Sequence, residues 1–265
     1  MKAAFIEGHG KLNQIKIGDI EEPEPGPNEV LIELKHAALN HLDIFVVRGW
    51  PGLSLSFPHV LGADGSGIVK EVGNGVSTLQ KGDRVAIHPG LSCGKCKHCL
   101  TGQQVFCEEF SILGEFESGT FAEFVKVPEI NALKVPENFP LDQAAAAPLT
   151  FLTAWRMLTT RAKTQRGEIV FIHGAGGGVS SASVQIAKHL GAKVIATTST
   201  PEKMEKTKNL GADHVINYEE NKDYAKHVYK DLTDRHGVDV VIDNVGKATF
   251  QTSIKLLRAG GRIIT

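Results

Sequence analysis

Short runs of alternating hydrophobic and polar residues fill the first half of the chain, the pattern of strands that bury one face. The clearest runs span residues 30–34, 66–72 and 121–127. Glycine and proline turns such as 25–27 and 81–83 separate them. Up to about Pro136 the pattern therefore favours a small, irregular β-barrel.

From Glu168 onward, apolar runs rich in β-branched residues alternate with stretches of helical pattern. These runs span residues 169–172, 194–197, 214–216, 238–242 and 262–265. Such alternation is typical of a parallel, doubly wound sheet in an α/β domain. Residues 141–160, rich in Ala and Leu, predict helices between the two halves. We therefore expect two domains, 1–148 and 149–265.

Composition narrows the class of function. The chain of 265 residues has 29 Lys and Arg against 30 Asp and Glu, so no basic surface for nucleic acid is expected. No apolar run approaches the length that spans a bilayer, and the amino terminus has only a short apolar stretch before Glu7. We expect a cytoplasmic protein that acts on a small molecule without contacting a membrane.

All four cysteines fall within fifteen residues, in the spacing C-x2-C-x2-C-x7-C: Cys93, Cys96, Cys99 and Cys107. Four thiolates form the closed tetrahedral shell of a structural zinc ion, held here by a lobe of about residues 92–108. An iron–sulfur cluster and a pair of disulfides are the alternatives. The first lacks the usual fourth cysteine followed by proline, and the second needs an oxidising compartment.

A glycine-rich turn follows the apolar run at 169–172 and precedes a helical stretch from Ser180 to Leu190. Such a turn lets the backbone approach a dinucleotide pyrophosphate at the amino end of the helix. The G-x-G-x-x-G pattern is not met literally, so the strand–turn–helix context carries the interpretation. An ordinary glycine-rich turn is the alternative. The predicted contacts are Ala175, Gly176, Gly177, Gly178 and Val179.

The next strand ends in Thr197–Thr200, where NAD-binding proteins usually place an acidic residue for the ribose. Hydroxyl groups can bind a 2′-phosphate instead, and a lysine can neutralise its charge. We therefore expect NADP(H), with NAD possible, bound through Thr198, Ser199 and Lys203 or Lys206. The alternative is a polar loop that caps the helix beginning at Pro201.

These features together resemble the medium-chain dehydrogenase/reductase superfamily. The motifs that carry the resemblance are Gly62-Ala63-Asp64-Gly65-Ser66-Gly67, Lys81-Gly82-Asp83-Arg84-Val85, Leu210-Gly211-Ala212-Asp213 and Val238-Asp239-Val240-Val241-Ile242-Asp243. The resemblance implies a GroES-like catalytic domain, a Rossmann domain truncated here after its fifth strand, and hydride transfer. It also implies a homodimer or homotetramer, although the usual dimer segment is absent. Because residues 262–265 read as a final unpaired strand, we expect a fragment or truncated product.

Alcohol dehydrogenases of this superfamily bind a catalytic zinc through two cysteines and a histidine. The matching histidine position holds Ala63, and no cysteine lies in residues 38–43 or beyond Pro148. Asn40 and Ala63 instead resemble the quinone and enoyl reductase branch, which reduces a C=C bond conjugated to a carbonyl without a catalytic metal. One alternative is an alcohol dehydrogenase with atypical ligands, drawn from His41, Asp43, His59 and Asp64. Another is a protein that binds NADPH without turnover.

In the reductase interpretation, Asn40 donates a hydrogen bond to the substrate carbonyl, His41 relays a proton or contacts the pyrophosphate, and Asp43 orients either neighbour. The alternative makes Asn40 a turn residue, His41 a surface residue and Asp43 a helix cap. The resemblance implies further cofactor contacts from Thr153, Tyr218, Asn244, Val245 and Gly246. Each of these residues could instead serve packing or a turn.

Overall fold

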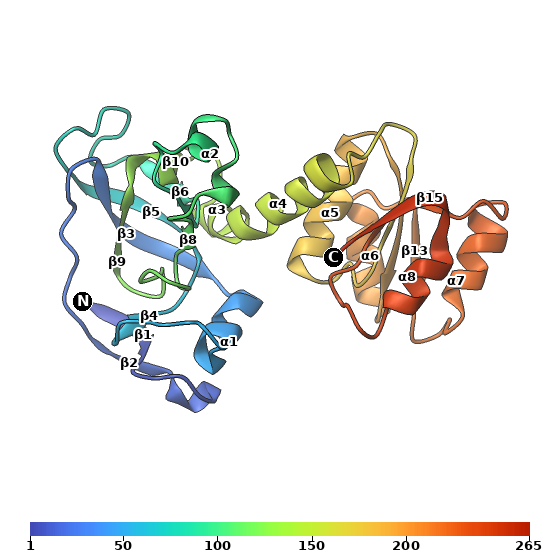
Figure 1. Cartoon of the computed structure of the whole chain (residues 1–265), viewed down its shortest axis with the longest axis horizontal. Coiled ribbons are helices and arrows are strands. Elements are labelled where there is room, and N and C mark those ends of the chain that lie inside the picture. Colours follow the sequence, from blue (N-terminus) through green and yellow to red (C-terminus); the bar gives the residue numbers. More distant parts are fainter. The chain divides into compact units, whose positions relative to one another are not determined.

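The structure, a computed structural model, describes residues 1–265 and divides into two compact units, residues 1–149 and 150–265 (Figure 1). The first unit is built mainly from antiparallel strands. The second alternates parallel strands with helices. No helix is both long enough and apolar enough to cross a membrane.

A curled antiparallel sheet of five strands forms the body of the first unit. In spatial order the strands are β10 (Ala132–Lys134), β6 (Arg84–Ile87), β5 (Asp64–Val72), β3 (Glu29–Ala38) and β9 (Phe124–Pro128). A second sheet has the order β2 (Lys16–Asp19), β1 (Lys2–Ile6) and β4 (His59–Val60). The pair β7 (Gly90–Leu91) and β8 (Ser111–Ile112) flanks the cysteine lobe.

The core of this unit follows the period-2 pattern of its strands. Val30 and Ile32 of β3 pack with Val125 and Val127 of β9 in one cluster. Lys126, between the two valines, is exposed, whereas Leu31 is buried outside this cluster. Helix α1 (His41–Arg48) packs beside a smaller cluster. Pairing with β5 and β9 fixes the register of β3, which is followed closely by α1.

Three short helices complete the first unit and its junction with the second. The cysteine lobe contains α2 (Lys97–Leu100), and α3 (Leu141–Ala146) packs on β3 and β5. Helix α4 (Pro148–Trp155) follows after one residue and continues as a wide helical turn over Arg156–Arg161. The helices predicted over residues 141–160 are therefore present, with a break at the proline.

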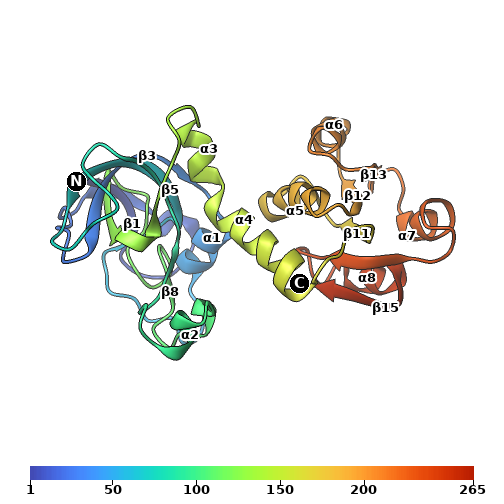
Figure 2. The same ribbon diagram turned by 90° about the horizontal axis from the view of Figure 1, so that it is seen from above.

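A fully parallel sheet of five strands forms the second unit. Its order is β13 (His214–Asn217), β12 (Lys193–Thr198), β11 (Ile169–Ile172), β14 (Val238–Ile242) and β15 (Leu257–Ile264). Figure 2 shows α5 and α6 on one side of this sheet and α8 on the other. The helices are α5 (Gly178–His189), α6 (Pro201–Asn209), α7 (Tyr224–His227) and α8 (Phe250–Leu256).

Alternate residues of the central strands enter different cores. Val170 and Ile172 pack with α5 in one cluster, whereas Phe171 packs with α7 and α8 in another. Residues Val194, Ile195 and Ala196 of β12 alternate in the same way. A sheet covered on both faces needs the continuous apolar runs that the sequence has, and the predicted doubly wound fold is confirmed.

Several strand boundaries differ from the sequence prediction, among them those of β9 and β15. Strand β9 begins at Phe124, three residues later than predicted, because Phe121 exchanges backbone hydrogen bonds with Ala4 and Leu61 instead. Strand β15 begins at Leu257, five residues before the predicted run at 262–265. Both differences reflect pairing partners that periodicity alone does not reveal.

Candidate active site and metal centre

The four cysteine side chains converge on one point. Their sulfur atoms lie within 4.8 Å of one another, with Cys93 and Cys99 3.9 Å apart and Cys96 and Cys99 3.5 Å apart. A tetrahedral zinc with Zn–S bonds of about 2.3 Å requires sulfurs about 3.8 Å apart. The measured separations therefore fit a structural zinc ion. They are far too long for disulfide bonds, and all four thiols are free.

The chain around the lobe favours thiolates. The backbone N–H groups of Lys95 and Cys96 point at the sulfur of Cys93 and lower its pKa to about 7. Cys99 and Cys107 are buried. Because all four ligand positions come from the protein, the ion would hold this lobe and leave no open position for chemistry.

Asn40 lies at the junction between β3 and α1. Its backbone is extended, and its N–H donates to the carboxylate of Asp43 over 2.7 Å, so Asp43 caps the helix as the alternative interpretation expected. Burial raises the pKa of Asp43, although hydrogen bonds from Asn40 and Gly62 act against the increase. The capping role fixes the backbone of Asn40 at the first turn.

The side chain of Asn40 is held by Asp64. Its Nδ2 donates to Asp64 Oδ2 over 2.9 Å, and the backbone N–H of Leu149 donates to Asp64 Oδ1 over 2.9 Å. Asp64 is fully buried, and burial raises its pKa to about 6. The second Nδ2 hydrogen of Asn40 faces the Ala38 carbonyl at 3.5 Å, too far for a strong hydrogen bond. The second Nδ2 hydrogen of Asn40 is therefore only weakly bonded.

The two histidines considered for this region are placed differently. His41 is exposed at the start of α1, where its ring lies 6.4 Å from that of Phe45. His59 is buried, its Nε2 lies 3.2 Å from the carbonyl of Gly114, and burial lowers its pKa. Neither histidine hydrogen-bonds to Asn40 or Asp64.

The atypical metal set does not form a cluster. The four cysteines are the only group of three or more His, Cys, Asp or Glu side chains in residues 1–265 whose ligand atoms converge. Both carboxylate oxygens of Asp64 accept hydrogen bonds, from Asn40 and Leu149, and His59 Nε2 is hydrogen-bonded to a backbone carbonyl. These bonds would have to break before either residue could bind a metal.

In the second unit, the glycine turn has the geometry of a phosphate-binding loop. Gly177 is the N-cap of the twelve-residue helix α5, and Gly178 is its first residue. Gly174 has a φ of +59° and donates its N–H to Thr197 Oγ1 over 3.1 Å. Ala175 donates to the Thr197 carbonyl over 2.8 Å. These bonds fasten the turn to β12 and leave the amino end of α5 for an anion.

The predicted adenosine-side residues lie together at the ends of β12 and β13. Thr198 ends β12, and its carbonyl accepts the backbone N–H of Tyr218 over 3.0 Å. The Thr198 hydroxyl is buried and has no hydrogen-bond partner. A Cβ added to Gly176 would lie 3.0 Å from Cδ of Lys203, so the lysine chain covers the glycine turn. An orphan hydroxyl beside an anion-binding turn fits a ligand phosphate.

In residues 198–206, helix capping and the proposed phosphate binding fall to different side chains. Thr200 caps α6 by accepting the Lys203 N–H over 3.3 Å, which leaves Thr198 and Ser199 free of that duty. Lys206 forms an ion pair with Glu202 over 2.6 Å. Lys203, rather than Lys206, is therefore the lysine available for a phosphate.

The side chain of Asp243 fixes the loop after β14 by hydrogen bonds to its backbone. Its Oδ1 accepts the N–H groups of Val245 over 3.1 Å and Gly246 over 3.0 Å, and Gly246 has a φ of +85°. Asn244 donates to Ser180 Oγ over 3.2 Å, which links this loop to α5. The turn interpretation is thus fulfilled at Gly246, while Asn244 and Val245 remain exposed.

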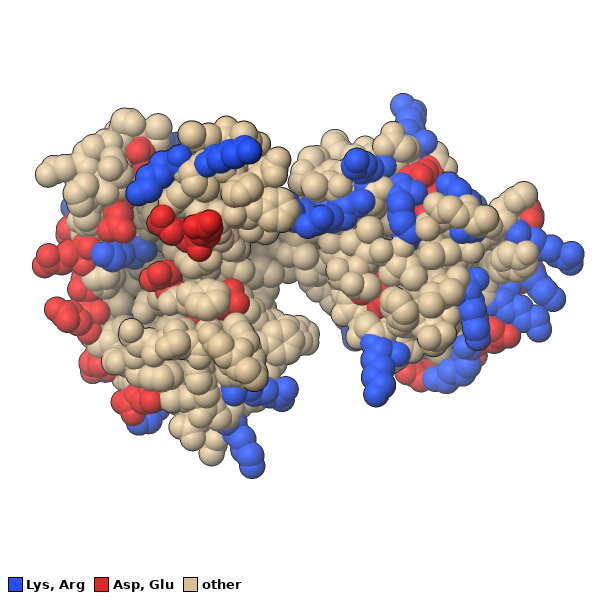
Figure 3. All heavy atoms as spheres, in the orientation of Figure 1, with Lys and Arg blue, Asp and Glu red and all other residues tan.

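Charge is divided unevenly between the units. Residues 150–265 contain 17 Lys and Arg against 11 Asp and Glu, whereas residues 1–149 contain 12 against 19. Figure 3 shows basic side chains gathered on the visible face of the second unit and acidic ones on the first. A positive unit favours an anionic dinucleotide.

Thr153, the remaining predicted cofactor contact, is exposed on α4.

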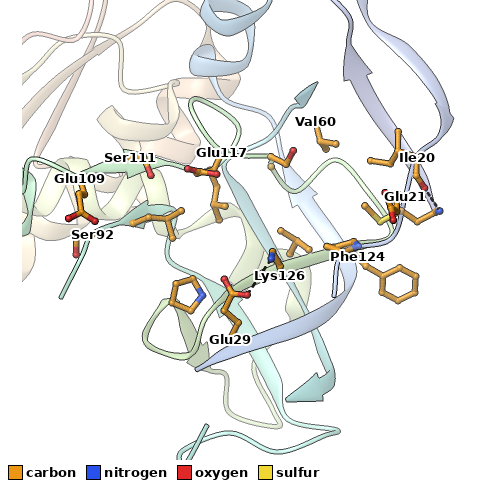
Figure 4. A pocket seen from close by; sticks show the side chains of 18 of the residues that line it. Ile20, Glu21, Glu29, Val60, Ser92, Glu109, Ser111, Glu117, Phe124 and Lys126 are labelled. Atoms are coloured by element: carbon orange, nitrogen blue, oxygen red, sulfur yellow. Dashed lines mark hydrogen bonds and ion pairs between the residues drawn. The ribbon is translucent and has the colours of Figure 1, made fainter. Parts of the chain in front are cut away.

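A hollow of about 620 Å³ lies elsewhere in the first unit, beside the cysteine lobe (Figure 4). Glu29 points toward Lys126 there, 3.4 Å away, while Glu109 and Glu117 lie apart from that pair. Of the residues predicted for the site, only Cys93 lines it. The hollow is therefore not the place where Asn40 would meet a substrate.

Several polar residues of this framework escaped the sequence prediction. The sequence indicates Asp64 only as a possible metal ligand and assigns no role to His173, Asp243 or Ser253. Each is a buried polar side chain. His173 and Asp243 directly follow the apolar strands β11 and β14, and this position could have indicated a role at the ends of these strands. Ser253 lies within a helix and gave no such signal.

Comparisons with known proteins match each of the two units to a dehydrogenase family model. Residues 26–137 match the model of the alcohol dehydrogenase GroES-like domain, and residues 178–265 match that of the zinc-binding dehydrogenase family. An alcohol dehydrogenase of Geobacillus stearothermophilus is 35% identical over 268 residues, which cover 100% of this chain and 77% of the relative. An acryloyl-coenzyme A reductase of Sulfurisphaera tokodaii is 33% identical over 264 residues, covering 100% and 76%.

A solved structure extends the agreement to three dimensions. The crystal structure of a NAD-dependent alcohol dehydrogenase superposes with a TM-score of 0.95 at 46% identity, over 99% of this chain and 76% of that one. The dehydrogenase domains, the dinucleotide-type sheet and the four-cysteine lobe that fits zinc all agree with the resemblance in the sequence. The chain belongs to the medium-chain dehydrogenase/reductase family of oxidoreductases.

Proposed function

We propose that the protein is an NADPH-dependent reductase of the C=C bond of a quinone or an α,β-unsaturated carbonyl compound, working without a catalytic metal. The observation that carries the proposal is the Asn40–Asp64 pair. A neutral amide, oriented by a buried carboxylate, lies in the segment 38–43, where the resemblance implies a cysteine ligand in alcohol dehydrogenases of the superfamily. An acryloyl-coenzyme A reductase among the relatives shows that C=C reduction occurs among proteins similar to this one.

The Asn40 amide suits the charge that develops in conjugate reduction. Bound NADPH would supply a hydride to the β-carbon, negative charge would collect on the carbonyl oxygen, and the resulting enolate would take a proton from water. The weakly bonded Nδ2 hydrogen of Asn40 could leave the Ala38 carbonyl and donate to that oxygen, while the bond to Asp64 keeps the amide from rotating. A donor fixed before the reaction costs no reorganisation when the charge appears.

Cofactor binding is assigned to the second unit. Gly176, Gly177 and Gly178 would hold the pyrophosphate at the amino end of α5. Thr198, Ser199 and Lys203 would hold the 2′-phosphate, because Thr198 has an unpaired buried hydroxyl and Lys203 lies over the turn. NADH remains the competing cofactor, and the NAD-dependent relative with known structure makes this comparison necessary.

Alcohol oxidation is the second candidate function. The alcohol dehydrogenase relatives and the 46% identical structure favour it. It requires stabilisation of an alkoxide, for which the superfamily uses zinc. Here Asp64 and His59 would first have to give up their present hydrogen bonds to act as ligands.

The test is an assay of cofactor oxidation with 2-cyclohexen-1-one, 1,4-benzoquinone and a crotonyl thioester. For an enone substrate, NADPH deuterated at the transferred position should place deuterium on the β-carbon of the product, which NMR detects. Asn40→Ala should lower kcat about 100-fold, as loss of one oxyanion donor does, with little change in NADPH affinity. Leu39→Ala, which truncates an exposed neighbour, is the matched control. Turnover of alcohols with NADP⁺ or NAD⁺, but none of the alkenes, would overturn the proposal.

A further inference from the structure

A buried chain of polar side chains runs behind the two cofactor loops of the second unit. The ring of His173 is 1% exposed and lies edge-on to the stacked rings of Phe171 and Tyr224, with ring centroids 4.8 and 6.0 Å away. Its Nε2 is 2.9 Å from Oγ of Ser253. Ser253 Oγ is in turn 2.7 Å from Asp243 Oδ2.

The direction of this chain can be deduced from the donors. Asp243 is ionised, because hydrogen bonds from Gly246, Thr249, Ser253 and Val245 lower its pKa despite burial. A carboxylate only accepts, and Asp243 Oδ2 lies nearer to Ser253 Oγ than the Thr249 carbonyl does, at 2.7 against 3.2 Å, so the Ser253 hydroxyl donates to Asp243. Ser253 Oγ must then accept a hydrogen from His173 Nε2. Nδ1 is left as an acceptor, facing the Tyr224 hydroxyl at 3.4 Å.

Burial keeps His173 neutral, since it lowers the pKa of the ring to about 4. Of the two neutral forms of the imidazole, only the one with its hydrogen on Nε2 donates to Ser253. The chain therefore has one direction at neutral pH, from His173 through Ser253 to Asp243.

Both ends of the chain lie against a cofactor loop. At one end, Asp243 Oδ1 holds the backbone N–H groups of Val245 and Gly246 and accepts Thr249 Oγ1 over 2.6 Å. At the other end, His173 is the first residue of the glycine turn after β11.

A second connection joins the same two loops. Asn244 Nδ2 donates to Ser180 Oγ, which donates to the His173 carbonyl over 2.8 Å. Two hydrogen-bond paths from the loop at residues 243–246 thus end at His173, one at its ring and the other at its carbonyl. Two independent connections between the same loops indicate that their relative position matters.

We propose that His173 and Ser253 are positioning residues that couple the glycine turn to the loop at residues 244–246, so that the dinucleotide meets both loops already in register. Neither residue touches the cofactor. The inference rests on the proposed cofactor site but concerns residues outside it. Because the chain is shielded from water, losing Ser253 Oγ would leave His173 Nε2 without a partner and Asp243 with one donor fewer.

The first test needs no variant. Long-range ¹H–¹⁵N NMR spectra of the apo protein at pH 7 should show one histidine with a protonated Nε2 and a bare Nδ1 that does not titrate between pH 5 and 9. His173→Gln assigns the signal among the 11 histidines by removing it. A ring protonated on Nδ1, or charged at pH 7, would overturn the proposed direction of the chain.

The second test compares Ser253→Ala with Ser183→Ala. Both serines are fully buried, but Ser183 donates only to the Val179 carbonyl within its own helix. Ser253→Ala should weaken NADPH binding about tenfold by fluorescence titration, the size of one lost buried hydrogen bond. It should also speed amide exchange at Val245 and Gly246. Ser183→Ala should leave both unchanged.

The outcomes separate this inference from the proposed function. If the wild-type protein binds no NADPH, the proposed cofactor is wrong, while the exchange rates at Val245 and Gly246 still test the coupling. If Ser253→Ala binds NADPH like the wild type and exchange does not change, the coupling is wrong whatever the reaction. Equal effects of Ser253→Ala and Ser183→Ala would also overturn it.

Discussion

Asn40 and Asp64 form a hydrogen bond of 2.9 Å between a half-buried amide and a fully buried carboxylate. The other oxygen of Asp64 accepts the backbone N–H of Leu149 in the first turn of α4. One carboxylate thus holds both the proposed carbonyl-binding residue and the start of a helix. The dependence of Asn40 on Asp64 is open to direct measurement.

Asp64→Asn should change how stability depends on pH. The pKa of Asp64 is raised to about 6 from 3.8, so the native state binds this proton more tightly than the unfolded state. Ionising Asp64 therefore costs stability as pH rises through this interval. Between pH 4.5 and 7.5 the wild type should lose about 2 kcal/mol that the variant does not lose. Urea unfolding of both proteins across this range gives the difference.

Leu39→Ala serves as a control in the same series, because it leaves Asp64 and its partners intact. A wild-type curve parallel to that of Asp64→Asn would show that the carboxylate ionises normally. The account of a desolvated Asp64 would then be wrong. Asp64→Asn should also lower kcat about tenfold, because Asn40 loses a charged hydrogen-bond partner.

Thr198→Val should stabilise the protein without cofactor and weaken NADPH binding. The Thr198 hydroxyl is buried without a partner, and replacing it by a methyl group removes that penalty of about 1 kcal/mol. Thr197→Val is the matched control. Its hydroxyl accepts the Gly174 N–H, so its loss should destabilise by about 1 kcal/mol. Thermal unfolding of both variants tests the contrast, and destabilisation by Thr198→Val would contradict it.

Lys203→Ala should raise the KM for NADPH about tenfold and leave the KM for NADH almost unchanged, since only NADPH carries the 2′-phosphate. Lys208→Ala removes an exposed lysine from the same helix and should affect neither. Steady-state kinetics with both cofactors measure the preference. An equal effect of Lys203→Ala on NADH and NADPH would remove the basis for preferring NADPH.

Cys107→Ser should release the metal and loosen the lobe. A structural zinc supplies folding free energy to the segment that binds it, so residues 92–108 should become sensitive to limited proteolysis. The β-strands of the first unit should keep their amide protection, because their core does not include the lobe. Proteolysis of the variant at the wild-type rate would show that the cysteines do not share an ion.

The sequence predicts the fold well because its signals are local. Continuous apolar runs identify β11, β12 and β14, and the cysteine spacing identifies the lobe. The Asn40–Asp64 pair lies 24 residues apart in the chain, and Ser253 lies 80 residues from His173. Contacts of this kind depend on the register of β3 against β5 and on where α8 packs. Periodicity does not fix either of these, so the partners of Asn40 and His173 emerge only in the structure.

Elemental analysis of zinc in extensively dialysed protein tests the central claim most directly, because it counts the metal in the lobe and in any second site together. The account predicts about one zinc per chain in the wild type and none in Cys107→Ser, together with C=C reduction by the wild type that weak chelators do not inhibit. About two zinc ions per chain, one of them lost with activity on chelation, would contradict it.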